Sequence, residues 1–473
     1  RNAMSGSVLR SLLCLLALCG VTALQVRPDS SRVAPRPVLR ATTLVAAAAA
    51  AAEDEGKAGL SASTANLVKS IVGSGVLSLP VGVAAFSSAR TAILPALTLL
   101  AVAGAISGYC FSAVGRVCAA TGSKSWGEAW SKSVGESTAW VPSALIGILT
   151  LSVSLQYTMV IGDSFSSIFS AWGLPSLIAS RSGAIVCLTA LGTLPLSLLP
   201  SLSALGFTSL LGVGGLLYTA AFMVARVRAY KPGTALHTAV PAALRPRFDS
   251  ALAFSPKVFV LVSILASAFL CHFVAPNFYN ELAPGEGAAA DAGPRKMKRF
   301  SLLTVSSFAL SAVLTGVVMT AGFLTFGGAS DGYILNNYAP TDRLAQLARV
   351  AIGSQIVFTY PFLHLGLRES TTALLKAVTG EAPPRVPTSV GIIALVTALA
   401  LRVTNLGLIA AVTGALVSTS IGYILPSLML GQTLARRVAD GDTSSGTRLE
   451  LLAARAITAL GVALAGIGVY AAV

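Results

Sequence analysis

Lys69, Asp163 and His272 are ionisable side chains that stand inside apolar stretches of this sequence, where a charge is expensive to hold. Lys69 precedes a glycine-rich interruption, Asp163 lies in one apolar run, and His272 lies in another. Ionisable groups within membrane segments are rare and usually functional, because they carry protons, bind ions or hold gates. Asp163 falls toward the end of its segment, so ordinary solvation is the alternative to a gating or proton-transfer role.

A glycine-rich interruption follows Lys69 within an apolar stretch of membrane-spanning length. This stretch, Asn66–Pro80, contains Gly73, Ser74 and Gly75 in succession. Glycine weakens a helix, and the freed backbone groups are tolerated in a bilayer only where protein or a water-filled cavity satisfies them. In secondary transporters such breaks direct half-helix ends at the charged ends of a substrate. The interruption therefore predicts a ligand site, with a glycine seam for close helix packing as the alternative.

A second irregular segment lies five predicted spans later, at Phe269–Leu282. It contains Pro276, which lacks a backbone N–H group and breaks or kinks a helix. Two interrupted helices at corresponding positions of two five-helix halves are typical of an inverted repeat with its binding site at the interface. This pairing favours the transporter interpretation, because packing seams need not recur at matched positions.

The composition indicates a membrane protein. Of the 473 residues, 54% are hydrophobic and 11% are charged, and the mean hydropathy of +0.78 is too high for a soluble globular protein. The net charge of +15 comes from Lys and Arg spread through short loops, so it flanks the membrane and predicts no nucleic-acid partner. Arg116, Arg349 and Arg368 lie near the ends of apolar segments and are expected to be snorkelling anchors.

Apolar segments of about 20 residues predict the elements that must position these groups. The sequence predicts an all-α polytopic membrane protein of about eleven transmembrane helices, with an inverted five-plus-five repeat and broken helices one and six. These helices are expected to form one domain over residues 61–473. The expected segments are 64–89, 91–115, 141–170, 182–200, 203–225, 256–281, 300–326, 344–367, 387–402, 404–431 and 451–473.

Residues 1–60 are expected to be a targeting leader and a disordered segment. A short apolar run at Leu12–Leu24 is typical of a secretory signal, and the arginine- and alanine-rich stretch after it is typical of a transit peptide. This order predicts the plastid envelope of an alga, and a vacuolar or other endomembrane is the alternative location. A plain disordered tail would give the same composition.

Five short motifs occur in order along the apolar segments: Asn66–Pro80; Cys271-His272 with Tyr279–Leu282; Gly322–Gly327 with Ile334–Asn336; Thr359–Pro361 with Arg368; and Gly422–Pro426. Together they resemble the amino acid/auxin permease family, near the branch that includes vacuolar and sodium-coupled neutral amino acid transporters. The resemblance covers residues 61–472. It implies that the chain moves amino acids through a lipid bilayer by alternating access, without a cofactor.

The resemblance also implies where a substrate would bind. The open backbone at Gly73, Ser74 and Gly75 would receive the α-carboxylate and the α-amino group of a small amino acid. His272 and Asn277, on the broken sixth helix, would read the substrate side chain or shape the pocket. A buried histidine is also commonly a hydrogen-bonded packing residue, and that alternative stays open.

Lys69 departs from the sodium-coupled proteins that the chain resembles. Those proteins carry an asparagine there, whose oxygen holds sodium together with a hydroxyl residue that Thr359 matches here. Lysine offers three donors and no acceptor, so its ammonium would replace the ion, and burial makes it a candidate proton carrier. The residues expected to couple the ion are therefore Lys69, Thr359 and Asp163, with a proton as the ion. Sodium symport and a snorkelling Lys69 are the alternatives.

Other function classes fit the sequence less well. Gly328–Gly332 matches the hydrolase nucleophile elbow, but it follows an apolar helix rather than a strand. The sequence has no clustered set of metal ligands and no phosphate loop, so neither an enzyme nor a metal site is expected. An amino-acid-sensing receptor with little net transport would use the same pocket, but the short loops hold no signalling domain.

Overall fold

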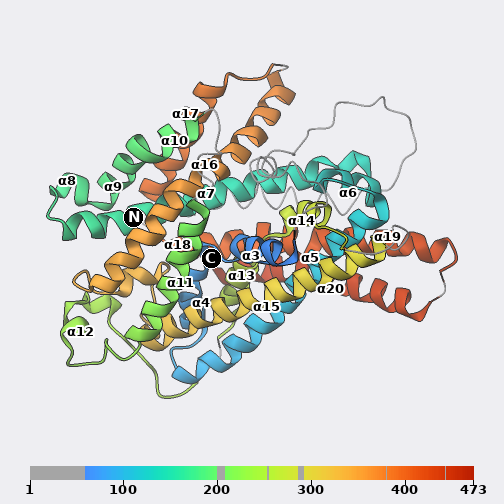
Figure 1. The fold of residues 1–473 in the computed structure, drawn as a ribbon. Helices are drawn as coiled ribbons and strands as arrows, with labels where there is room; N and C mark the ends of the chain where they lie inside the picture. Colours follow the sequence, from blue (N-terminus) through green and yellow to red (C-terminus); the bar gives the residue numbers. More distant parts are fainter. Residues whose placement is uncertain are drawn as a thin grey trace.

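The computed structural model describes residues 59–199, 208–252, 255–285, 292–379, 381–442 and 444–472, which form a bundle of helices (Figure 1). Within these ranges the only extended pairings are two isolated bridges, from Ala89 to Asp249 and from Arg247 to Gly327. The predicted signal and transit segments lie outside the described residues.

Each predicted apolar segment coincides with one helix or with a series of shorter helices. The first half of the chain contains α3 (Leu60–Ile71), η1 (Ser74–Ser78) and α4 (Leu79–Phe86) as helix one, then α5 (Ile93–Thr121), α7 (Trp140–Ala171), α9 (Arg181–Leu188) with η4 (Thr189–Thr193) and α10 (Leu194–Leu198), and α11 (Thr208–Arg226). The second half contains α13 (Val258–Ala268), η7 (His272–Val274) and α14 (Ala275–Glu281) as helix six, then α15 (Ala292–Phe326), α16 (Arg343–Thr379), α17 (Arg385–Arg402), α18 (Leu406–Thr413) with η10 (Gly414–Ser418), η11 (Ser420–Ile424) and α19 (Leu425–Ala439), and α20 (Ser445–Ala472). Short helices in the connections are η2 (Arg90–Ala92), α6 (Trp126–Ser133), η3 (Glu136–Thr138), α8 (Ser176–Ala179), α12 (Ala235–Ala239), η6 (Ala242–Leu244) and η9 (Ile334–Asn337).

The helix lengths agree with the predicted number of spans. Within the described ranges, nine helices are long and apolar enough to cross a membrane, and the bent pair of helix one makes a tenth. Gly212–Arg226, inside α11, is a shorter apolar helix. The ninth and tenth segments separate where expected, because Asn405 Oδ1 accepts a hydrogen bond of 3.0 Å from the Leu408 amide and caps α18.

Two long helices, α7 and α16, pack along each other in opposite directions (Figure 1). A Cβ at Gly147, early in α7, would lie 3.2 Å from Ser370 Cβ, late in α16. At the other end, Gly353 leaves room for the ring of Phe165. Small residues at these crossings let the two backbones approach closely, as is common between membrane helices.

An aromatic cluster joins α5 to α15. Phe111 stacks on Phe300 at 5.6 Å between ring centroids, and its centroid lies 5.7 Å from that of Phe308. Gly115 makes this packing possible, because a Cβ there would overlap the Phe300 ring. Such ring pairs contribute about 0.5–1.5 kcal/mol beyond the area they bury. The cluster therefore fixes α5 and α15 as one wall of the bundle.

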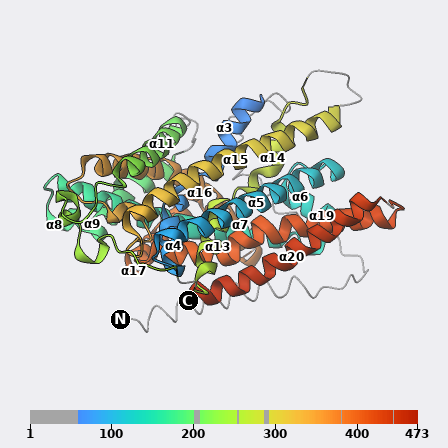
Figure 2. The same ribbon diagram turned by 90° about the horizontal axis from the view of Figure 1, so that it is seen from below.

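Helix one lies between α15 and α13. Figure 2 shows α3 beside α15, where Ser307 Oγ donates to the Thr64 carbonyl at 3.5 Å. Farther along, a Cβ at Gly322 would lie 2.6 Å from Pro80 Cγ. Residue numbers therefore rise together on helix one and α15, which makes the two helices parallel. On its other side, α4 packs against α13.

Candidate functional site

Helix one is interrupted directly after α3, as predicted. Gly73 has an extended backbone (φ −105°, ψ −171°), and the two half-helices are bent by 44°. Among the described residues, the carbonyls of Lys69 and Val72 and the amide of Gly75 have no hydrogen-bond partner. A Cβ at Gly73 or Gly75 would meet no atom within 4 Å, so open space adjoins this backbone. For Ser74 the structure describes the backbone alone.

Helix six is interrupted between the end of α13 and the start of α14. The break covers Phe269–Val274, where Cys271 has φ −140° and ψ 9°. Pro276 lies in the first turn of α14, where the missing N–H group costs no helical hydrogen bond. The proline therefore begins the second half of helix six, and the turn itself is made by the residues before it.

His272 is buried at the helix-six break. It is 1% exposed, and its Nε2 lies 2.9 Å from the Ser107 carbonyl. Because a carbonyl only accepts, Nε2 carries the proton and Nδ1 is left as an acceptor with no partner. The ring centroid lies 6.0 Å from that of Phe111 and 6.2 Å from that of Phe308. This geometry matches the packing alternative, with Nδ1 as the one ring atom left for a ligand.

Asn277 lies one turn farther along the same broken helix. Its side chain is half-buried in α14 and has no hydrogen-bond partner among the described residues. Its amide group can both donate and accept. The structure therefore places His272 at the break of helix six and Asn277 on the half-helix that follows it, each with polar atoms unused.

Lys69 and Thr359 are half-buried on helices with different principal neighbours. Lys69 lies in the last turn of α3, and within the described part of the chain its ammonium has no hydrogen-bond or ion-pair partner. Thr359 Oγ1 donates to the Gln355 carbonyl at 2.8 Å. While α3 packs on α15, α16 packs mainly on α7 and α11. No hydrogen bond joins these two predicted coupling residues.

Asp163 is held in an ion pair, so the solvated alternative is wrong for it. Its Oδ1 accepts from Arg181 Nε at 2.7 Å, and its side chain is only 11% exposed. Arg181 also donates to the carbonyls of Ala400, at 3.0 Å, and Val403, at 3.3 Å. Asn336 Nδ2 donates to the second carboxylate oxygen at 3.5 Å. The pair therefore ties α7, α9, α17 and the α15–α16 loop together.

The α15–α16 loop, residues 327–342, closes this end of the bundle. Tyr333 OH shares a hydrogen bond of 2.8 Å with Ser164 Oγ on α7. Ser78, at the end of η1, donates to the Gly332 carbonyl at 2.7 Å. We call this hydrogen-bonded region, together with the Asp163 ion pair, the sealed end.

Two buried charges of the sealed end were not anticipated. Arg349 is 2% exposed and donates to the carbonyls of Leu335, at 2.6 Å, and Tyr338, at 2.7 Å. The expectation that Arg349 is a snorkelling anchor is therefore wrong, because the loop folds back over the start of α16 and covers it. Asp342 likewise accepts from Arg226 Nε at 3.0 Å, a contact that spacing along the sequence could not reveal.

Comparison with known proteins gives concordant matches at the level of sequence. A family profile described as transmembrane amino acid transporter protein matches residues 56–473. The putative sodium-coupled neutral amino acid transporter 11 of Danio rerio is 27% identical over 382 residues, covering 79% of this chain and 80% of that protein. Amino acid transporter AVT6E of Arabidopsis thaliana is 24% identical over 389 residues, covering 78% and 75%.

Solved structures match at the level of the fold. The inward-facing conformation of Mhp1 matches with a TM-score of 0.52 at 13% identity, covering 94% of this chain and 93% of that one. MhsT in complex with L-phenylalanine also matches with a TM-score of 0.52 at 13% identity, covering 88% and 100%. These similarities confirm the predicted inverted five-plus-five repeat with broken helices one and six.

Proposed function

This chain belongs to the transmembrane amino acid transporter family, whose profile spans residues 56–473, and from that premise we propose that it carries a small zwitterionic amino acid by alternating access. The family and the fold support amino acid transport across a membrane by a multi-pass protein, and the relatives are named as transporters rather than enzymes. The substrate contacts and the coupling ion are the finer parts of the proposal. We also propose that residues 61–473 act as one transport domain.

The helix-one break is the observation that carries this proposal. The Gly75 amide opens the half-helix that continues through α4, so the positive end of that helix dipole would attract an α-carboxylate. The carbonyls of Lys69 and Val72 close α3, at the negative end of its dipole, and would accept from an α-amino group. Unpaired donors and acceptors, separated by one turn and beside open space, match the two charged ends of an amino acid.

The unused polar atoms of helix six supply the second part of the proposed site. His272 Nδ1 is an acceptor without a partner, and the Asn277 amide is unbonded among the described residues. We assign these two residues to the pocket that receives the substrate side chain. Helix six adjoins helix one through the packing of α13 on α4 and η1, which supports a shared site.

Asp163 is assigned to gating. Arg181 already occupies its carboxylate, and a carboxylate fixed in an ion pair is a poor proton carrier because protonation would sacrifice the pair. The Asp163–Arg181 pair instead fastens the sealed end, and alternating access requires that this end open to exchange substrate.

A proton is the proposed coupling ion, with Lys69 as its carrier. A half-buried ammonium without an acidic partner loses its charge more readily than a paired one, and loss of that charge would change the polarity of the break. The naming of relatives as sodium-coupled supports the competing proposal, in which Thr359 would help to bind sodium. A lysine ammonium cannot ligate a cation, and this difference separates the two proposals.

Uptake into proteoliposomes tests the function. Vesicles containing the purified protein are offered a panel of labelled amino acids, with sodium or choline outside and with or without a pH gradient. Accumulation of small amino acids that needs a pH gradient and no sodium supports the proposal. Binding of an amino acid without uptake would indicate the sensing receptor, and an absolute need for sodium would overturn proton coupling.

A further inference from the structure

Two buried hydroxyl groups on α15 face the helix-one break without a hydrogen-bond partner. Ser311 is 0% exposed and Thr315 is 1% exposed, and neither hydroxyl is bonded. Five other hydroxyl residues of α15 bond to backbone carbonyls, namely Ser301, Thr304, Ser306, Ser307 and Thr325. Thr320 has no hydrogen bond among the described residues either, but it is only half-buried. A buried hydroxyl without a partner costs about 1–3 kcal/mol, so this pair needs an explanation.

The register of α15 against helix one places these hydroxyls beside the break. On these two parallel helices Ser307 lies beside Thr64, and Gly322 lies beside Pro80. The residues of α15 that lie four and eight positions after Ser307 are therefore level with residues 68–73 of helix one. Ser311 and Thr315 follow Ser307 at that spacing, which keeps them on the same side of the helix. The two hydroxyls therefore lie level with the last turn of α3 and with Gly73.

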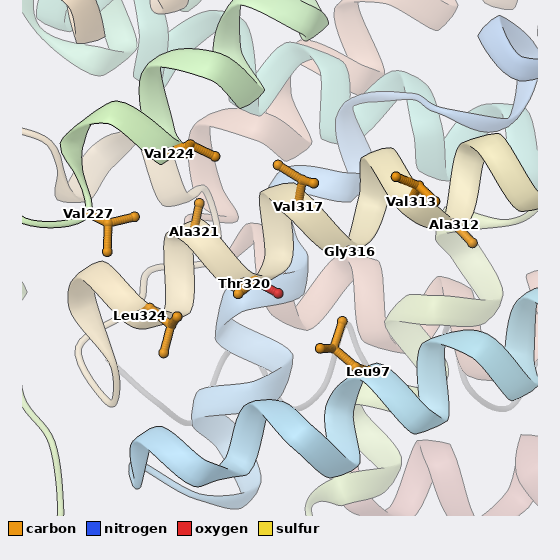
Figure 3. A pocket seen from close by; sticks show the side chains of 10 residues that line it. All are labelled: Leu97, Val224, Val227, Ala312, Val313, Gly316, Val317, Thr320, Ala321 and Leu324. Carbon is orange, nitrogen blue, oxygen red and sulfur yellow. The ribbon is translucent and has the colours of Figure 1, made fainter.

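The opposite face of α15 points away from the break and is mainly apolar, with Thr320 as the one hydroxyl residue among those that line its groove. Figure 3 shows Val313, Val317 and Leu324 around a groove of about 420 Å³ between α15, α5 and α11. The hydroxyl pair is therefore confined to the face that meets helix one. A lipid-facing face and a polar inner face on one helix are typical of a membrane helix that lines a functional site.

The groups that meet at this level are rich in acceptors. The carbonyls of Lys69 and Val72 only accept, and the hydroxyls of Ser311 and Thr315 can accept. They stand at the negative end of the α3 dipole, which favours a cation. A primary ammonium supplies three donors and a positive charge. We propose that Ser311 and Thr315 bind a primary ammonium group at the helix-one break.

This inference rests on the proposed function, because two sources of a primary ammonium are at hand. One is the α-amino group of a bound amino acid, and the other is the side chain of Lys69. In the first case the hydroxyls select amino acids over analogues that lack the amine. In the second they hold the coupling lysine in place between transport steps.

Uptake by hydroxyl-deleted variants tests the inference. The variants are Ser311→Ala, Thr315→Val and the double variant, with Thr315→Ser as the version that keeps a hydroxyl. Ser306→Ala is the matched control, because Ser306 lies elsewhere on α15 and bonds to the Leu303 carbonyl. Melting temperatures in detergent should not fall below that of wild type, since deleting an unpaired buried hydroxyl removes no hydrogen bond and relieves the cost of burying it.

Binding of the substrate amine predicts a rise in KM of about tenfold for each deleted hydroxyl. The preference for an amino acid over its α-hydroxy acid should narrow by a similar factor, and Thr315→Ser should restore it. If the hydroxyls bind Lys69 instead, the hydroxyl-deleted variants should take up less substrate but keep the wild-type preference for an amino acid over its α-hydroxy acid. The same deletions should then have no further effect on uptake in a protein that already carries Lys69→Met. Either result supports the inference.

Unchanged kinetics in both hydroxyl variants would overturn the inference while leaving amino acid transport standing. Variants that alter only a dependence on sodium would overturn it as well, because the oxygens would then serve a metal cation. A wild-type protein that neither binds nor transports any amino acid of the panel would overturn both this inference and the proposed function.

Discussion

Replacing Gly75 with valine separates folding from transport at the helix-one break. A Cβ at Gly75 would meet no atom within 4 Å, and the residue does not have a positive φ. Substituting such a glycine stabilises a fold by about 0.4–1 kcal/mol, because the unfolded chain loses freedom. The isopropyl group would instead fill the space through which a carboxylate approaches the Gly75 amide. One lost hydrogen bond to a charged group is worth about 1.5–3 kcal/mol, a loss of about tenfold to 150-fold in apparent affinity.

Labelled amino acid uptake and thermal unfolding of the same preparation measure the two effects. Gly391→Val on α17 is the matched control, because a Cβ there also meets no atom within 4 Å and the site is remote from the break. Gly332→Val is the opposite control, since its Cβ would lie 2.5 Å from the Gly407 nitrogen and should lower the melting temperature. Undiminished uptake by Gly75→Val would refute the placement of the substrate, and a collapsed melting temperature would refute the open space.

Three further outcomes are expected. Lys69→Ala should remove the response of uptake to a pH gradient while substrate exchange survives, and wild-type uptake should persist when choline replaces sodium; a strict sodium requirement would contradict this. Asp163→Asn removes the negative charge of the pair with Arg181 and should lower the free energy of unfolding by about 3–5 kcal/mol. Thermal unfolding that matches wild type would show that the pair does not fasten the sealed end. A hydrogen bond from the Lys124 amide lowers the pKa of the Glu128 carboxyl in the folded protein. The ionised carboxylate therefore stabilises the fold fully at pH values above its unfolded pKa of about 4.3. This stabilisation is lost as the pH falls through the lower pKa of the folded state. Glu128→Gln should therefore lower the free energy of unfolding by less than about 1 kcal/mol at neutral pH. If the variant is still less stable than wild type in acid, the ionised carboxylate is not the source of the stabilisation.

Hydropathy and backbone chemistry made the fold predictable. Spans follow from runs of apolar residues, and the breaks follow from Gly73, Gly75 and Pro276, whose effects on a helix act within a few residues. The position of the second break shows the limit of that reasoning. Proline marks where α14 can begin, while the turn at Cys271 depends on packing against α5 and η11.

The partners of the buried charges could not be predicted, because they come from distant parts of the chain. Asp163 meets Arg181 across 18 positions and Asn336 across 173. Arg349 looked like an anchor because it lies near a helix end, and only the folded loop shows that carbonyls surround it. The isolated hydroxyl of Ser311 was equally invisible, since a sequence does not reveal which serines bond to their own helix.

The two ends of helix one are fastened by different forces, and for the proposed transport cycle this difference predicts a temperature dependence of turnover. Near η1 the attachment is polar, through Ser78 and the neighbouring Asp163 ion pair. By contrast, α3 packs on α15, buries the apolar side chains of Leu67 and Ile71, and receives one long hydrogen bond from Ser307. Polar contacts that break together require a large activation enthalpy, while apolar contacts near room temperature separate with little enthalpy change. Exchange through the sealed end should therefore slow steeply on cooling, and movement of α3 should slow far less.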